Sequence, residues 1–455
     1  MTSLLQHAQA RVVQTVRRSL SSDLKRLMRD TSWSTASSVA VSGMYLLEIM
    51  LLSRYLSKEL LGIYFLIISF PELVQEILDM RVREIMVRYL AQFIHHDELR
   101  RAAALIKLMW LVDVGVSLLG LLVVAALSQF ASVYVVGQPG YAGLMVLYGL
   151  GTVLGALDSA AGTILRVLGR FDLAFLGSFL VSASRLALIG LAVLVGASLD
   201  GLITSRVIAF GLSTVIFGGL TWPVVWRLLR PHYQASLAEL RPFRSEMIRF
   251  AIHVNISSTI KTLATKLDVI IVGAILGPGS VAVYKVGTQL AKTLTLLSDS
   301  MITAIYPQFA TLKAQGNERA IERLARQITL IMVVIQAPVL VGVLIWRREL
   351  LVLFAGAAYH DNTVVFVIAT LGVAFTMVFF WIRPYLLSFG RASALTNSLV
   401  VGTIASLLAL VSLTQVWGEA GAAVGFSMFY VGTILAQLWQ MRWSRRGLAL
   451  TPHTD

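Results

Sequence analysis

The sequence predicts an all-α membrane protein with about twelve transmembrane helices. Of its 455 residues, 57% are hydrophobic and only 14% are charged, and the mean hydropathy is +0.78. Soluble domains carry about 25% charged residues. The apolar residues also gather in long stretches, and about 20 mostly apolar residues in a helix cross a bilayer. The chain therefore has the composition and the patterning of a multi-pass membrane protein.

Twelve stretches are long and apolar enough to be spans. They lie at residues 32–54, 60–82, 104–128, 141–165, 171–196, 202–226, 248–276, 281–306, 327–354, 363–389, 393–416 and 421–441. Six spans precede and six follow a polar segment, which predicts two six-helix lobes joined by a linker. The expected organisation is a basic amphipathic segment at 1–31, an N-lobe at 32–226, a linker at 227–247, a C-lobe at 248–443 and a tail at 444–455.

Both termini are predicted to be cytoplasmic. Most of the 38 lysines and arginines lie in the N-terminal segment, the linker and every second loop, and the opposite loops hold only Arg54, Lys58, Arg347 and Arg348. Cytoplasmic loops are the ones enriched in these residues. This rule also accounts for the net charge of +14, so no nucleic-acid partner is expected. Residues 1–31 fit a helix on the inner leaflet, or alternatively a disordered basic tail.

Seven basic residues fall inside the predicted spans: Arg185, Arg206, Lys261, Lys266, Lys285, Lys292 and Arg383. A charge inside the membrane is costly and usually faces the bundle interior or an aqueous cavity. Lys285, Lys292 and Asp299 recur every seven residues and so share one helical face. We expect these cations to line a cavity that binds an anionic substrate. The alternative for each is a structural ion pair or a side chain that reaches the membrane surface.

Carboxylates inside or beside the spans are candidates for coupling or gating: Glu48, Glu72, Asp79, Asp268 and Asp299. A membrane carboxylate can be poised to accept a proton, although Asp268 could equally be a structural counter-ion of Lys266. A shift of the sequence by 220 residues places Glu48 on Asp268 and Glu72 on Lys292. Parallel repeats of this kind are one plan for transporters, and the second match predicts an ion pair between the lobes.

Signatures of enzymes and cofactors are absent from the sequence. There is no P-loop, the His95–Glu98 run lacks the spacing of a zinc motif, and the chain has no cysteine. The loops on the side opposite the termini are too short for a catalytic domain. We therefore expect neither an enzyme nor a bound cofactor or metal.

Four stretches carry a resemblance to a known family. Residues 64–92 resemble the second span of polysaccharide flippases, and residues 304–309, followed by Gly316 and Asn317, resemble the exit from their eighth span. Residues 275–284 resemble the preceding turn, and residues 354–359 resemble a loop after the ninth span. The chain is thus similar to the Wzx-type O-antigen and exopolysaccharide flippases of the MATE-like MOP superfamily.

The resemblance implies two lobes in a V shape, alternating access and a place in the bacterial inner (cytoplasmic) membrane. Its implied cargo is a polyprenyl-diphosphate-linked oligosaccharide, moved from the inner to the outer leaflet for polysaccharide and lipopolysaccharide biosynthesis. Lys261, Lys285 and Lys292 would then receive the diphosphate. The implied partners are the lipid-linked oligosaccharide, membrane lipids and other polysaccharide-assembly proteins.

Other functions remain open from the sequence. A MATE-like multidrug or cation antiporter should have an acidic cavity, which the lysines do not favour. A membrane glycosyltransferase or polymerase should have a large catalytic loop. A scaffold of a glycan-assembly complex would leave the intramembrane cations without a purpose. The glycan, the coupling ion (proton, sodium or none) and the oligomeric state are not determined.

Overall fold

The computed structural model describes residues 32–33, 35–79, 82–232 and 234–448 of the chain, and within these ranges the regular structure is entirely helical. The predicted all-α class is confirmed. The basic segment 1–31 and most of the tail 444–455 lie outside the described residues. The amphipathic helix expected at 1–31 therefore stays a prediction.

The first half of the described chain forms one helical bundle. A helix at Thr35–Tyr55 is followed by α2 (Lys58–Leu78), α3 (Val82–Ile85), the π-helix η1 (Met86–Leu90), α4 (Ala91–His95), α5 (Leu99–Ala131), the π-helix η2 (Ser132–Val136), α6 (Ala142–Leu154), α7 (Asp158–Val167), α8 (Phe171–Leu194) and α9 (Leu199–Leu229). The predicted linker contains two 3₁₀ helices, η3 (Arg230–His232) and η4 (Leu237–Phe243).

The second half contains ten further elements. They are α10 (Arg244–Leu276), α11 (Pro278–Thr293), α12 (Leu296–Ala314), α13 (Glu318–Ile345), α14 (Arg347–Ala355), the 3₁₀ helix η5 (Ala357–Tyr359), α15 (Thr363–Val378), α16 (Ile382–Ser388), α17 (Ala392–Trp417) and α18 (Glu419–Leu448).

Ten helices in the described part are long and apolar enough to cross a membrane, against twelve predicted. The two predicted spans outside this set are 248–276 and 281–306, which are the most polar ones. Helix α10 covers the first of them without interruption. The second is divided, because α11 ends at Thr293 and α12 begins at Leu296. A single helix over 281–306 is therefore wrong.

The division between α11 and α12 has a local cause. The carbonyl of Lys292 accepts hydrogen bonds from the backbone N–H of Thr295 at 3.0 Å and from the Thr295 hydroxyl at 2.8 Å. Threonine hydroxyls compete in this way with the regular hydrogen bonds of a helix. The sequence does not predict this turn, because the apolar residues around Thr295 are typical of a continuous span.

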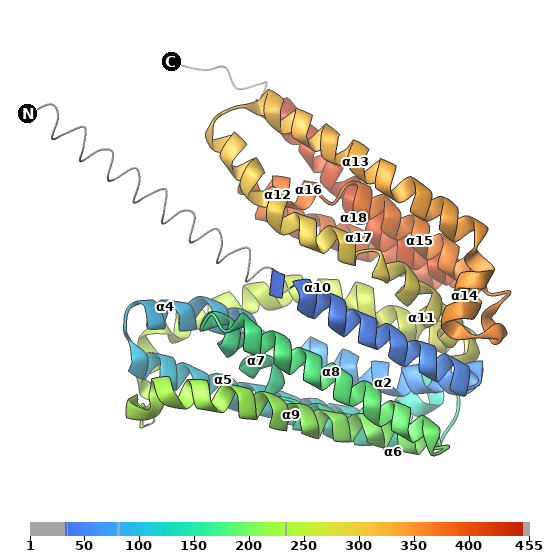
Figure 1. Ribbon diagram of the computed structural model, residues 1–455, viewed down its shortest axis with the longest axis horizontal. Helices are drawn as coiled ribbons and strands as arrows, with labels where there is room; N and C mark the ends of the chain where they lie inside the picture. Colours follow the sequence, from blue (N-terminus) through green and yellow to red (C-terminus); the bar gives the residue numbers. More distant parts are fainter. Residues whose placement is uncertain (1–31, 34, 80–81, 233, 449–455) are drawn as a thin grey trace, which may run out of the picture.

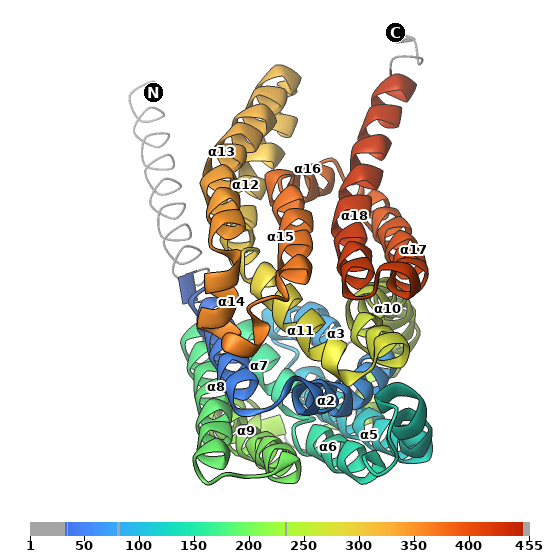
Figure 2. The same cartoon turned by 90° about the vertical axis from the view of Figure 1, so that its right-hand side faces the viewer.

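The two bundles meet at one end and diverge towards the other (Figure 1). Helices α2 and α4–α9 form one arm, helices α12–α18 form the other, and α10 and α11 lie between them. The diverging end carries α4 and the α12–α13 connection. Viewed from the joined end, α2 and α11 lie side by side (Figure 2) and pack closely against each other.

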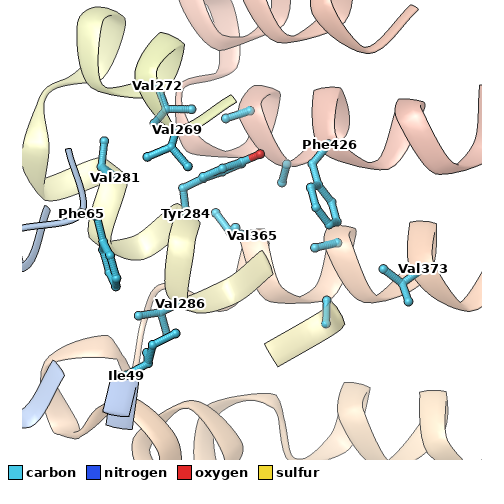
Figure 3. Packing of buried hydrophobic residues seen from close by; sticks show 14 of the residues in the cluster. Ile49, Phe65, Val269, Val272, Val281, Tyr284, Val286, Val365, Val373 and Phe426 are labelled. Atoms are coloured by element: carbon cyan, nitrogen blue, oxygen red, sulfur yellow. The ribbon is translucent and has the colours of Figure 1, made fainter. Parts of the chain in front are cut away.

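Small residues permit the close contact between α2 and α11. A Cβ added at Gly62 would lie 1.7 Å from the carbonyl oxygen of Pro278, so only glycine fits there. Beside this contact, Tyr284 of α11 packs among Val269, Val272 and Phe426 (Figure 3). Transmembrane helices associate through such close packing rather than through a hydrophobic driving force.

Polar contacts close the joined end of the V. Lys58 Nζ donates a hydrogen bond to Asn362 Oδ1 at 2.6 Å and lies over the Tyr359 ring, 5.3 Å from its centroid. Arg54 Nη2 donates to the Leu353 carbonyl at 2.5 Å. These contacts connect the end of the helix Thr35–Tyr55 and the start of α2 with α14, η5 and the start of α15, so the bundles are sealed at this end.

Candidate functional site

A cavity of about 370 Å³ lies between the helices where the two bundles meet. Its lining comes from the helix Thr35–Tyr55 and from α2, α8, α9, α10 and α11. The charged lining residues are Glu72, Arg185, Arg206, Lys266, Lys285 and Lys292. Five of the seven predicted intramembrane cations are thus in one cavity, which we call the cationic cavity.

Helical periodicity explains which side chains reach the cationic cavity. On α11, Lys285, Gln289 and Lys292 are four and three residues apart and line it together. The opposite face of α11 holds buried residues such as Val283. On α2, Ser69 and Glu72 face the same space. Helix α11 therefore presents a polar stripe to the cavity and packs its apolar face elsewhere, whereas α2 also contributes the apolar Phe65 and Ile68 to the lining.

The two arginines share one carboxylate. Glu48 is only 1% exposed, with Arg185 Nε at 3.0 Å and Arg206 Nη2 at 3.4 Å from its carboxylate oxygens. The guanidinium of Arg206 also lies 5.8 Å from the ring centroid of Tyr64 and donates to its hydroxyl at 3.4 Å. Two cations against one anion leave this group with net positive charge. Glu48 is placed as a buried counter-ion behind the cavity wall.

Lys266 pairs with a carboxylate from another helix. Its Nζ lies 2.8 Å from Glu72 Oε2, and the other oxygen of Glu72 accepts a hydrogen bond from the Tyr148 hydroxyl at 3.0 Å. The ion pair predicted between Glu72 and Lys292 is therefore wrong. The alternative pairing of Asp268 with Lys266 is also not formed, because residues two apart on a helix point in different directions, and the Asp268 carboxylate instead accepts a hydrogen bond from Tyr284.

Lys285 and Lys292 differ from the other three cations. Neither ammonium group forms an ion pair with any residue that the structure describes. Lys292 Nζ lies over the ring of Phe426, 5.1 Å from its centroid, and a cation is attracted to the face of an aromatic ring. These two lysines are the cations most available to an anion that enters the cavity.

The remaining predicted site residues lie elsewhere. Asp268 is 4% exposed and accepts hydrogen bonds from the Tyr284 hydroxyl at 2.8 Å and from the Val269 N–H at 2.7 Å. Arg383 is exposed on α16 and does not line the cationic cavity. Lys261 on α10 and Asp299 on α12 belong to described helices, but their side chains lie outside the described part.

A second cavity of about 350 Å³ adjoins the first and has the opposite charge. Its carboxylates are Glu72, Glu76, Asp79 and Asp113, and its other polar lining residues are Gln75, Ser117, Thr152, Ser159 and Lys266. Glu72 and Lys266 line both cavities, so their ion pair forms the partition between them. Of the predicted carboxylates, Asp79 is found here, near the end of α2.

Sequence reasoning missed Asp113 and Tyr148. Asp113 falls within the predicted span 104–128, and the criterion that identified the lysines, an ionisable residue inside a span, would have found it. Tyr148 carried no comparable signal, because tyrosines are common in membrane helices. Only its position across from Glu72 shows that it binds the carboxylate.

Comparisons with known proteins agree with this architecture. Residues 51–364 match the family model described as polysaccharide biosynthesis protein, and no curated protein shows a significant match. The fold is similar to that of the lipid II flippase MurJ in an inward closed conformation, with a TM-score of 0.66 and 14% identity over 90% of this chain and 87% of that one.

Two further solved structures are similar to this chain in fold. An inward-facing multidrug resistance MATE transporter of the MOP superfamily has a TM-score of 0.66 and 16% identity over 93% of this chain and 96% of that one. A MOP superfamily transporter from Pyrococcus furiosus, described as having a binding pocket of reverse polarity, has a TM-score of 0.62 and 14% identity over 93% and 96%. At such identities, the likeness shows the fold.

Proposed function

The chain belongs to the polysaccharide biosynthesis protein family, and from this premise we propose that it is a flippase for a polyprenyl-diphosphate-linked oligosaccharide. Its family and its structural neighbours are flippases and transporters rather than enzymes. The proposed cargo moves from the inner to the outer leaflet of the bacterial inner membrane, where polysaccharide assembly continues.

The cationic cavity carries this proposal. A diphosphate cannot cross about 30 Å of hydrocarbon unaided, because it would lose its hydration. Five cations line the cavity against a single lining carboxylate, Glu72. Fixed cations inside a protein can replace the lost hydration of an anion. Unpaired cations inside a membrane protein raise its free energy, and binding of an anionic substrate offsets that cost.

Within the cavity we assign the first contact with the diphosphate to Lys285 and Lys292. Both lack ion-pair partners among the described residues, whereas Arg185 and Arg206 share Glu48. The arginines would add positive potential and hydrogen-bond donors to the same anion. The polyprenyl tail would remain in the bilayer and reach the cavity between the diverging arms of the V (Figure 1).

The open end of the V supports the proposed direction of transport. The joined end is sealed by Lys58 with Asn362 and by Arg54 with Leu353. We place the diverging end in the cytoplasm, since it carries the segments rich in lysine and arginine. The described conformation then accepts cargo from the inner leaflet. Alternating access would move the N-lobe (32–226) against the C-lobe (248–443), with residues 227–247 as the linker.

No ATP-binding motif is needed to drive this transport. A membrane potential that is negative inside favours outward movement of an anion by about 2.3 kcal/mol per elementary charge per 100 mV. Among the carboxylates proposed for ion coupling, Glu72 and Asp79 line the acidic cavity. Glu48 and Asp268 are 1% and 4% exposed, which makes them less accessible to an ion from solution.

The test is a flipping assay in sealed proteoliposomes with a fluorescent polyprenyl-diphosphate sugar. We expect the intact protein to translocate the probe and Lys285→Ala and Lys292→Ala to lose most of this activity. Lys313→Ala is the matched control, because Lys313 is exposed near the end of α12 and does not line the cavity. Activity that survives both cavity variants would discard the assigned site, and no translocation by the intact protein would discard the proposed function.

A second candidate function is a MATE-like antiporter for cations or cationic drugs. The observation in its favour is the acidic cavity with Glu76, Asp79 and Asp113. The same proteoliposomes test it, with ethidium and an imposed proton or sodium gradient. Ethidium transport without movement of the lipid-linked sugar would establish the antiporter. If neither is transported, the remaining candidate is a scaffold for other polysaccharide-assembly proteins.

A further inference from the structure

We propose, on the basis of the flippase function above, that Glu72 is an internal counter-ion which the substrate diphosphate displaces from Lys266. In the described conformation, Glu72 of α2 and Lys266 of α10 form an ion pair at 2.8 Å. An anion in the cationic cavity competes with Glu72 for this lysine. The exchange releases α10 from α2 and so couples substrate binding to movement of the bundles.

The ion pair belongs to a polar seam between α2 and α10. One turn beyond it, the Thr262 hydroxyl donates to Glu76 Oε1 at 3.5 Å. Further along the two antiparallel helices, the Asn255 side-chain amide donates to the Asp79 carbonyl. Glu72–Lys266 is the only one of these three contacts that joins opposite charges. It is therefore the contact of the seam that an incoming charge weakens most.

The pair is accessible to the substrate. The side chains of Lys266 and Glu72 are 35% and 33% exposed, and both line the cationic cavity. Lys285 and Lys292 line the same cavity of about 370 Å³. A diphosphate bound by those two lysines is thus in the space that Lys266 faces, where a third ammonium group lowers its energy further.

Glu72 keeps partners after the exchange. An unpaired charge within a membrane protein is costly, so displacement of Lys266 alone would be opposed. Tyr148 still donates to Glu72 Oε1 at 3.0 Å. Glu72 also lines the second cavity together with Gln75 and Ser117, which offers space and polar groups for the released carboxylate.

The exchange makes movement conditional on the charge of the cargo. A neutral sugar or a cationic drug in the cavity does not compete with a carboxylate for an ammonium group. A ligand shifts a conformational equilibrium only by its differential affinity for the two states. The two states here are the closed and the open seam. The diphosphate binds more tightly to the open state, because only there is the Lys266 ammonium group free to attract it.

A double-mutant cycle with inorganic pyrophosphate tests the exchange. Calorimetry on the purified full chain would compare the intact protein with Glu72→Gln, Lys266→Gln and the double variant. Glutamine preserves the acceptor for Tyr148 and removes the charge. We expect Glu72→Gln to bind pyrophosphate about five- to tenfold more tightly, and this gain to vanish in the Lys266→Gln background, because coupled residues are not additive. An equal gain in both backgrounds would mean a general field effect and overturn the exchange.

A distance measurement between the two arms reports the movement of the bundles, which the affinity for pyrophosphate does not. The chain has no cysteine, so His96→Cys on the first arm and Gln315→Cys on the second take spin labels at exposed positions. Pyrophosphate should shift the interlabel distance in the otherwise intact protein, and Glu72→Gln should produce that shift without pyrophosphate. The control Glu76→Gln removes the same charge one turn away and should leave the unliganded distance unchanged.

The outcomes separate this inference from the proposed function. If pyrophosphate binds and the lipid-linked sugar is flipped, but Glu72→Gln leaves the unliganded distance unchanged, the exchange is wrong and the flippase stands. If the exchange is observed with pyrophosphate but no lipid-linked sugar is translocated, the proposed cargo is wrong. If pyrophosphate does not bind to the intact protein, the exchange is wrong, and the flipping assay alone decides the proposed function.

Discussion

Gly62 of α2 lies directly against the backbone of Pro278 in α11, where an added Cβ would come within 1.7 Å of the proline carbonyl oxygen. This contact joins the two halves of the chain next to the sealed end of the V. Because Gly62 and Pro278 are buried, neither helix can yield without moving its neighbours. The crossing of α2 and α11 is therefore set by the absence of a side chain at one position.

We expect Gly62→Ala to destabilise the protein by about 1–3 kcal/mol, the usual cost of overpacking a well-packed core. The measurement is the melting temperature of the purified protein in detergent. Gly43→Ala is the matched control, since a Cβ at Gly43 meets nothing within 4 Å and alanine favours a helix. A melting temperature for Gly62→Ala equal to that of Gly43→Ala would show that the contact between α2 and α11 is looser than described.

Removal of Arg206 should destabilise the protein by breaking a buried ion pair. Its side chain is 7% exposed and shares Glu48 with Arg185. Arg206→Met leaves Glu48 with one partner, and breaking a buried pair costs about 3–5 kcal/mol. The double variant Arg206→Met with Glu48→Gln should recover part of that loss. Thermal unfolding of the two variants measures the difference, and equal stabilities would show that Glu48 does not depend on Arg206.

The sealed end should open when Lys58 loses its charge. Lys58→Met removes the hydrogen bond to Asn362 and the contact with the buried Tyr359 ring, together worth about 1 kcal/mol. Ser69 lines the cationic cavity, so Ser69→Cys reports access to it. An impermeant maleimide added on the Lys58 side should label this cysteine about fivefold faster. Lys313→Met is the control, and an unchanged labelling rate in Lys58→Met would argue against the seal.

Binding of an anion by Lys292 should depend on charge and not on shape. Lys292→Gln should weaken pyrophosphate binding about tenfold, while Lys292→Arg should keep most of it, because both arginine and lysine bind phosphate groups. Phe426→Leu should weaken binding less, by a factor of about two to five, since it keeps the charge of Lys292 and removes the cation–π contact with it, along with ring contacts to Tyr284 and Tyr430. Calorimetry with pyrophosphate gives the three ratios. Equal losses in the glutamine and arginine variants would indicate a packing role for Lys292.

Helix faces could be predicted from the sequence more reliably than helix partners. The intramembrane cations were found because a charge in the membrane must face a cavity or a partner, and Arg185, Arg206, Lys266, Lys285 and Lys292 do line one cavity. The partner of Glu72 was not predictable. A shift of α10 along its axis by less than a turn would bring another residue to the same carboxylate, and nothing in the spacing of either helix sets that offset.

Composition and hydrophobic length alone determined that this protein is helical and crosses a membrane many times, since the bilayer allows few other structures for such a chain. Periodicity determined that Lys285 and Lys292 share a face. Only the tertiary structure decided that α11 ends before Leu296, that Glu72 meets Lys266, and that an acidic cavity with Asp113 lies behind this pair. These features depend on the offsets and crossings of helices far apart in the chain, which close contacts such as that between Gly62 and Pro278 set.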